Sequence, residues 1–160
     1  MQIAIRPAST HDLEELDEVI EEVDALHRER LPHILQKPHG PPREREYMLE
    51  LLADESYGVF VAHAGGEILG FVQIAIRDTP PIPILVPRRI AAVENLAVRS
   101  AFRRMGIGRA LMRQAERWAE ELGATEIELN VYEFNQAAFS FYRSLGYTTS
   151  SRRMGKRLSQ

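Results

Sequence analysis

Apolar and polar residues alternate with two different periods along this chain, and the period at each place predicts the element there. Residues 2–8 alternate and then meet a proline, which predicts a short strand. Residues 9–29 repeat apolar positions every three or four residues, which predicts a helix capped by Ser9 or Thr10. A proline-rich stretch at 31–42 predicts a loop, and residues 43–54 predict a second, shorter helix.

The rest of the chain switches repeatedly between the two periods. Residues 57–78 predict two strands joined by an Ala-Gly-Gly-Glu hairpin turn. Residues 79–87 contain four prolines, so they predict an exposed connection rather than a central strand. Strands are predicted over 88–98 and 125–132, helices over 106–124 and 135–146, and one or two final strands over 147–158. We expect Gly123 and Gly146 to end the two helices and Asn135 to cap the second.

This order of elements predicts an α/β (α+β) fold. The expected architecture is a single mixed, mostly antiparallel twisted sheet of about six or seven strands, with helices on both faces. The chain has 160 residues and shows no internal repeat, low-complexity segment or linker, so we expect one domain over residues 1–160.

Composition narrows the possible chemistry. The net charge of −3 gives no global reason to expect DNA or RNA as a partner. No cysteine is present, which removes disulfides, thiol nucleophiles and cysteine-ligated zinc. His27, His33 and His39 are spaced too widely for a typical metal site, so we expect no metal. Without an apolar signal core or a membrane-length apolar run, we expect a cytoplasmic protein with no membrane partner.

Two glycines and three arginines surround the predicted start of the third helix. Gly106 and Gly108 let backbone approach a ligand closely, and a helix start offers free N–H groups with partial positive charge. Arg103, Arg104 and Arg109 add full charges, so the stretch predicts a phosphate cradle. It lacks the lysine and Ser/Thr of a Walker loop. Leu111 stands where a dinucleotide fingerprint requires a third glycine or alanine.

The segment from Glu94 to Met112 resembles the acyl-CoA-binding motif of the GNAT acetyltransferase superfamily. In that motif, a strand leads through a short loop into Gln/Arg-x-x-Gly-x-Gly/Ala at the start of a helix. The segment from Glu128 to Tyr147 is similar to the next motif of the family, with Asn-x-x-Ala followed by Phe/Leu-Tyr-x-x-Leu-Gly-Phe/Tyr. Both motifs stand in the expected order, and the first strand and helix also look like those of the family.

The resemblance implies a GNAT-like acyl-CoA N-acyltransferase fold, in which two central parallel strands splay apart to admit acetyl-CoA. The pantetheine arm would pair with strand backbone as an added strand, and the pyrophosphate would rest on N–H groups of the glycine loop. The residues implied to bind the cofactor are Leu96, Ala97, Val98, Arg103, Arg104, Met105, Gly106, Ile107, Gly108, Arg109, Asn135 and Tyr142.

The implied activity is transfer of an acetyl group from acetyl-CoA (coenzyme A) to a primary amine, by direct attack in a ternary complex. The acceptor would be a small-molecule amine or a peptide or protein amine, and analogy with the family suggests a homodimer. The alternative is a non-catalytic acyl-CoA sensor of the same fold. Eight acids and no bases lie from Asp12 to Asp24, which is either a solvated helix face or an attraction for a cationic acceptor.

Three residues are candidates for proton transfer. Tyr142 matches the motif tyrosine that donates to the leaving sulfur, although an apolar helix face would also explain it. Alternation places Glu94 on one side of its strand with Leu96 and Val98, which suits a base acting through a water. Glu128 is the rival base, on the strand implied to face the same gap. Asn135 serves either as a helix cap or as a partner of the pantetheine arm.

Overall fold

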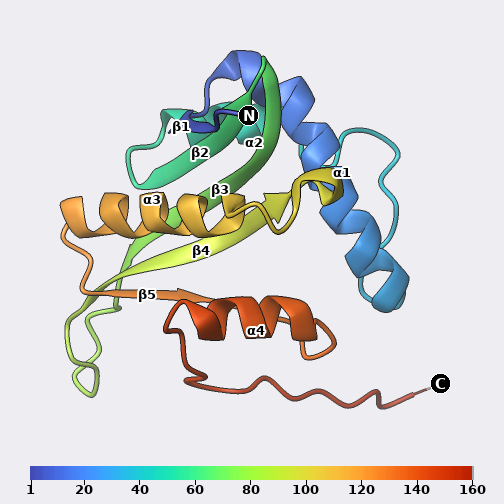
Figure 1. The fold of residues 1–160 in the computed structure, drawn as a ribbon. Helices are drawn as coiled ribbons and strands as arrows, with labels where there is room; N and C mark the ends of the chain where they lie inside the picture. The colour runs from blue at the N-terminus through green and yellow to red at the C-terminus, as the bar shows by residue number, and fades with distance from the viewer. Residues whose placement is uncertain (160) are drawn as a thin grey trace. The chain divides into compact units, whose positions relative to one another are not determined.

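The structure is a computed structural model that describes residues 1–159, and its chain divides into two compact units, Met1–Asn130 and Val131–Gln160. The first unit holds a five-stranded sheet, three helices and two single 3-10 turns (Figure 1). Its elements are β1 (Ala4–Pro7), η1 (Thr10–Asp12), α1 (Leu13–Arg30), α2 (Arg45–Ala53), β2 (Tyr57–Ala64), β3 (Glu67–Asp78), β4 (Arg89–Val98), η2 (Ser100–Phe102), α3 (Ile107–Glu121) and β5 (Glu126–Leu129).

The sheet runs in the order β1-β2-β3-β4-β5, and each strand is antiparallel to its neighbour except for the parallel pair β4 and β5. This confirms a mixed, mostly antiparallel sheet. The β2–β3 hairpin turns at Gly65 and Gly66, whose φ values of 59° and 78° are those a two-residue primed turn requires. Residues 79–88, between β3 and β4, form the predicted non-strand connection.

The second unit contains α4 (Gln136–Ser144) and the segment that follows it. The expected cap is present, because Asn135 Oδ1 accepts a hydrogen bond from Ala138 N at 3.1 Å. Gly146 follows the helix with a φ of 96°, and Gly123 ends α3 in the same way with a φ of 86°.

The prediction of six or seven strands was too high, because residues 147–158 contain no strand. Residues 148–159 are exposed, and the large apolar side chains among them, Met154 and Leu158, are 92% and 93% exposed. A strand is held by burying one face at every second residue. The tail is mostly serine, threonine, arginine and lysine, so it has no apolar face of that kind.

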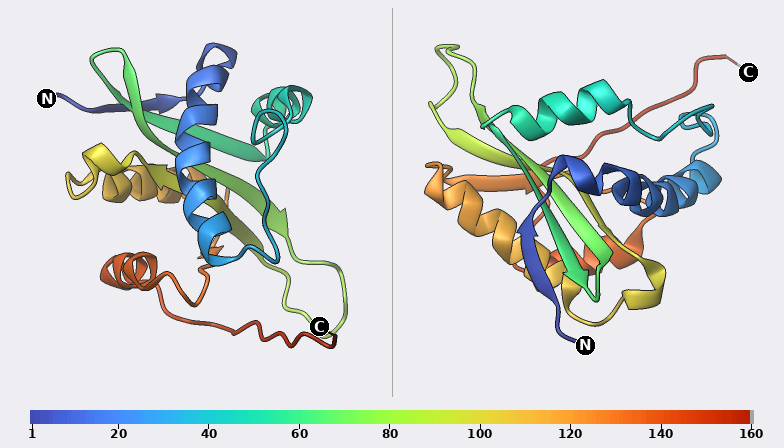
Figure 2. Two further views of the ribbon diagram at one scale, coloured as in Figure 1. Left: turned by 90° about the vertical axis from the view of Figure 1, so that its right-hand side faces the viewer. Right: turned by 90° about the horizontal axis from the view of Figure 1, so that it is seen from above.

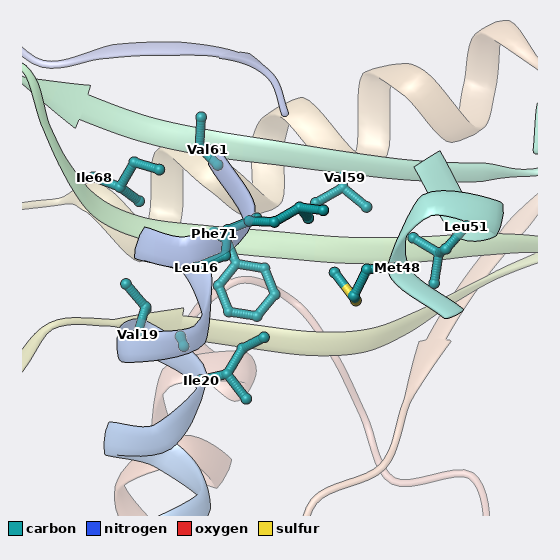
Figure 3. Close-up of a cluster of buried hydrophobic side chains, with 11 residues drawn as sticks. Leu16, Val19, Ile20, Met48, Leu51, Val59, Val61, Ile68 and Phe71 are labelled. Carbon is teal, nitrogen blue, oxygen red and sulfur yellow. The ribbon is translucent and has the colours of Figure 1, made fainter. Parts of the chain in front are cut away.

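Helices cover both faces of the sheet within the first unit, with α1 and α2 on one face and α3 on the other (Figure 2). On the first face, Leu16, Val19 and Ile20 of α1 and Met48 and Leu51 of α2 pack on strand residues around Phe71 (Figure 3). The opposite face is packed by the buried stripe of α3, which consists of Ile107, Leu111, Met112, Ala115 and Ala119. Helices α1 and α3 thus pack on β3 and β4 from opposite faces of the sheet.

Gly70 of β3 lies against the backbone of β4, and we expect Gly70→Ala to destabilise the protein. A Cβ there would lie 2.6 Å from the Ala97 carbonyl oxygen and 3.2 Å from the Val98 Cα, both backbone atoms that cannot swing aside. Overpacking of this kind costs about 1–3 kcal/mol, so thermal unfolding should show a midpoint lower by several degrees. Gly40→Ala is the control, because a Cβ at Gly40 meets nothing within 4 Å; equal midpoints for the two variants would contradict the prediction.

Asp12 links β1 to the start of α1 through its ion pair with Arg6. This pair should make the free energy of unfolding depend on pH in the acid range. Arg6 donates to the two carboxylate oxygens of Asp12 at 2.7 and 2.8 Å, and this hydrogen bonding lowers the pKa of the buried Asp12 carboxyl to about 2. A lowered pKa means that the stabilisation is complete above about pH 4 and is lost as the pH falls towards 2. We expect Asp12→Asn to cost about 1–2 kcal/mol at pH 7, because Arg6 is partly exposed.

Urea unfolding of the wild type and Asp12→Asn at several pH values measures this contribution. The difference in unfolding free energy between the two proteins should shrink steadily below pH 4. A difference that stays constant down to pH 2 would show that the ion pair is not its source.

Candidate functional site

The parallel strands β4 and β5 share a short ladder and then part. Their pairing covers Ile90–Val93 against Glu126–Leu129, whereas β4 continues along β3 as far as Val98. Within the unit Met1–Asn130, residues 94–98 therefore have no strand on the side of β4 that faces away from β3. An open edge of this kind can pair with an extended ligand through backbone hydrogen bonds.

The register of β4 identifies which backbone groups face this open edge. Arg99 N donates to Leu69 O across the β3–β4 ladder at 2.8 Å. Because direction alternates along an antiparallel strand, the backbone of Ala97 also points to β3, and that of Leu96 and Val98 points away from it. Val98 O accepts a hydrogen bond from Arg103 Nε at 3.3 Å, as expected for a carbonyl on the open side.

The loop after β4 presents a run of backbone N–H groups. Within the unit Met1–Asn130, the N–H groups from Arg104 to Arg109 find no hydrogen-bond acceptor, and the first amide of this stretch that does is Ala110, which donates to Gly106 O. Arg104 and Gly106 have φ values of 63° and 80°, both left-handed. A left-handed arginine is unfavourable by roughly 1–2 kcal/mol, and such backbone turns neighbouring N–H groups towards one side, where an anion can bind.

The loop's side chains separate into one anchor and several exposed groups. Ile107, the first residue of α3, is 2% exposed, so its side chain is held in the core and only its backbone N–H can reach a ligand. Arg103, Arg104 and Arg109 are exposed, and within Met1–Asn130 none of them lies within 4 Å of a carboxylate. The loop therefore combines six open amides with three cations that are not neutralised.

Glu94 lies in a β-bulge of β4, at the first residue after the part of β4 that pairs with β5. Gln73 pairs with Asn95 and Ile74 with Val93, so Glu94 has no opposite residue on β3. Its carboxylate is held from two sides: Gln73 Nε2 donates to Oε1 at 3.0 Å, and Arg77 Nη2 donates to Oε2 at 2.5 Å. The bulge interrupts the alternation from which the side of Glu94 was predicted, and its immediate neighbours are therefore polar rather than apolar.

A tyrosine from β2 lies within the electrostatic reach of this carboxylate. The negative charge of Glu94, together with burial, raises the pKa of the Tyr57 phenol. Tyr47 of α2 adds a smaller effect in the same direction and is 45% exposed. Glu94 thus lies in a neighbourhood that contains an amide, a guanidinium and the phenol of Tyr57.

Glu128 has a different setting. It lies on β5 and pairs with Ala92 of β4, its side chain is exposed, and within Met1–Asn130 it has no hydrogen-bond or ion-pair partner. The alternation predicted for this strand is confirmed from Glu126 to Leu129, because Ile127 and Leu129 are half-buried and both glutamates are exposed. The carboxylate that the protein holds in place is therefore Glu94.

In the second unit, Tyr142 lies on α4 with its ring against two other aromatic rings. The ring centroids of Phe141 and Tyr147 are 5.1 and 5.8 Å from that of Tyr142, both in edge-to-face geometry. Burial raises the pKa of Tyr142 to about 12, so its hydroxyl keeps its proton at neutral pH. Asn135 uses Oδ1 as the helix cap, which leaves its Nδ2 as a donor.

The acidic run of α1 is mostly engaged inside the molecule. Carboxylates from this run bind Arg6, Arg28, Arg43 and Arg99, and Glu22 accepts a hydrogen bond from Ser100 N at 2.9 Å. Six of the eight acids have such a partner: Asp12, Glu15, Glu18, Glu21, Glu22 and Asp24. This observation disfavours the idea that the run as a whole attracts a cationic acceptor.

Sequence reasoning missed Gln73, Arg77 and Tyr57 as neighbours of Glu94. One signal was present, because Gln73 interrupts the apolar run of β3 and is only 4% exposed. A buried polar residue needs a hydrogen-bond partner, and for Gln73 that partner is the Glu94 carboxylate. Arg77 and Tyr57 carry no comparable signal, since exposed strand ends commonly bear such residues.

Known acetyltransferases resemble this chain in sequence. The sequence profile of the acetyltransferase (GNAT) family matches residues 21–147. An N-alpha-acetyltransferase of Sulfurisphaera tokodaii is 30% identical over 106 residues, which cover 63% of this chain and 62% of that protein. The chain spans about half the length of the curated relatives it matches, between 41% and 62% for four of them.

Solved structures share the fold. The BH1408 protein of Bacillus halodurans, in a mutant form, superimposes with a TM-score of 0.93 at 26% identity, over 98% of this chain and 99% of that one. The aminoglycoside N-acetyltransferase AAC(6')-Iy, solved in complex with CoA, gives a TM-score of 0.76 at 20% identity, over 98% and 94% of the two chains. Among residues 1–159, no helix is both long and apolar enough to cross a bilayer.

Proposed function

Because the chain belongs to the acetyltransferase (GNAT) family, we propose that it transfers the acetyl group of acetyl-CoA to a primary amine. The observation that carries this proposal is the run of open amides from Arg104 to Arg109 beside the open edge of β4. A diphosphate needs several N–H donors and positive charge in one place. A pantetheine arm, which contains two amide groups, needs a free strand edge.

The residues proposed to hold the co-substrate follow from this fit. The amides of the glycine loop bind the pyrophosphate, and Arg103, Arg104 and Arg109 balance its charge. The backbone of Leu96 and Val98 pairs with the pantetheine amides, and Asn135 Nδ2 adds a donor. AAC(6')-Iy, which shares the fold, was solved in complex with CoA, and this supports CoA as the co-substrate class.

The proposed chemistry is direct transfer, which needs one proton acceptor and one proton donor. A protonated alkyl amine with a pKa near 10.4 needs about 5 kcal/mol to lose its proton at pH 7, and we propose that Glu94 takes that proton, directly or through a water. The free amine nitrogen then attacks the thioester carbonyl carbon, and the carbon–sulfur bond breaks. Tyr142 gives its proton to the departing thiolate, and the nitrogen releases its second proton to solvent, from which Tyr142 is reprotonated. Glu94 then returns its proton to solvent, so the products are the amide and coenzyme A.

The amine class of the acceptor is supported by relatives named for amine acetylation, one an N-alpha-acetyltransferase and another an aminoglycoside N(6')-acetyltransferase. The proposed acceptor is therefore a primary amine of a small molecule, a peptide or a protein. A homodimer and a cytoplasmic location, both expected from the sequence, stay predictions.

Two measurements, made one after the other, test the proposed acetyl transfer. Acetyl-CoA is titrated into the protein by calorimetry, and thiol release is then followed with a panel of primary amines. Saturable binding followed by amine-dependent release of one thiol per amide is the expected result. Absence of binding would reject the proposal, and binding without release over the whole panel would favour an acyl-CoA sensor.

A further inference from the structure

The two partners of Glu94 differ in how firmly the protein fixes them. Gln73 is 4% exposed and lies inside the sheet, so its hydrogen bond to Oε1 anchors the carboxylate. The Arg77 side chain is 60% exposed and near the end of β3, and it reaches Oε2 from the solvent side. Glu94 itself keeps 23% of its side-chain surface exposed. One oxygen is therefore held by the fold, and the other is covered by a cation that solvent can reach.

We propose that Arg77 occupies the place of a cationic amine on Glu94, and that a protonated acceptor binds by displacing the guanidinium. The inference rests on the proposed acetyl transfer and specifies its substrate class, a primary alkyl amine that arrives as an ammonium ion. An ammonium group and a guanidinium make the same charge-assisted hydrogen bond to a carboxylate oxygen. The oxygen therefore has a charged hydrogen-bond donor both before and after the exchange.

The surroundings of Glu94 suit such an exchange. Exposed ion pairs are weak, because solvent screens both charges and long side chains lose freedom when they pair. The displaced Arg77 can return to water, since most of its side chain is already exposed. Tyr57 adds an aromatic ring in the electrostatic neighbourhood of the carboxylate, and aromatic faces attract cations. An amine that is neutral at pH 7 has no advantage in competing with Arg77.

Removing the competitor should therefore improve binding of a cationic acceptor. We expect Arg77→Gln to lower the KM for butylamine by about two- to five-fold, the range that loss of an exposed ion pair corresponds to. Aniline, which is neutral at pH 7, should show no change in KM. Arg77→Lys keeps a cation at the same place and should behave like the wild type.

Arg88→Gln is the matched control. Arg88 is an exposed arginine immediately before β4 that pairs with Glu126 at 2.9 Å rather than with Glu94, and its replacement changes the net charge by the same amount. An equal fall in the butylamine KM for Arg88→Gln would show a general charge effect and overturn the proposal. A KM that rises or stays constant in Arg77→Gln would do the same, as would an equal fall for aniline.

Failure of the proposed function can be separated from failure of this inference. If acetyl-CoA binds but no amine is acetylated, the transfer reaction is wrong, and butylamine binding to the two variants is then compared by calorimetry at low salt. Tighter binding to Arg77→Gln than to Arg88→Gln supports the exchange on Glu94 without any turnover. Equal binding contradicts it.

Discussion

Tyr142→Phe is expected to lower kcat by about a hundred-fold, while the affinity for acetyl-CoA stays within about two-fold. The hydroxyl is the only group removed, and the ring that contacts Phe141 and Tyr147 is retained. Because burial raises the pKa of Tyr142 to about 12, the phenol is a neutral donor over the whole physiological pH range. Without it, the thiolate leaves with no proton source beside it, and the transition state loses that stabilisation.

The measurement combines steady-state thiol release, acetyl-CoA calorimetry and a thermal melt. Tyr132→Phe serves as the control, because Tyr132 lies in the same unit and is 45% exposed. The control variant should keep its rate within about two-fold of the wild type. A kcat for Tyr142→Phe within the same range would remove Tyr142 from the chemistry and leave it as a packing residue of α4.

Glu94→Gln is expected to lower kcat/KM by about a hundred-fold at pH 7, whereas Glu128→Gln should stay within about two-fold. We expect the two variants to differ because Gln73 anchors the Glu94 carboxylate, whereas Glu128 is exposed on β5. Glutamine keeps the shape of glutamate but cannot accept a proton. The defect should shrink as the pH approaches 10, because an alkyl amine then arrives already deprotonated.

Rates of both variants across pH 7 to 10 separate the possible bases. A large loss in Glu128→Gln with a small one in Glu94→Gln would move the base to β5. Small losses in both would indicate that a chain of waters removes the proton. A loss in Glu94→Gln that does not shrink with pH would show that the residue acts on binding or position rather than as a base.

Much of the fold was predictable because it depends on local chemistry. The hairpin turn at Gly65 and Gly66 requires left-handed backbone, and the sequence supplies the residues that adopt it. The cap at Asn135 needs a short side chain three residues before the amide it accepts from, and that spacing is visible in the sequence. The terminal strands were predicted wrongly, because strand formation needs an apolar face to bury, which residues 147–158 lack.

The candidate site was predictable only in part. The left-handed positions at Arg104 and Gly106 belong to the loop that its glycines and arginines had indicated. The surroundings of Glu94 were not predictable, because a bulge shifts the register between β3 and β4 at that residue. The period of two no longer applies across a bulge, so sequence spacing alone did not identify Gln73 and Arg77 as the partners.

The sequence by itself determined the order of elements, the turns and caps, and the loop whose amides are open to an anion. These are consequences of backbone conformation and periodicity, and both act over a few neighbouring residues. Tertiary structure decided which carboxylates are held or neutralised, how far β4 and β5 stay paired, and that Glu94 lies between a buried amide and an exposed guanidinium. Those features depend on strand register and on the docking of helices, which bring together residues that are distant in the chain; the two partners of Glu94 are 21 and 17 positions away from it.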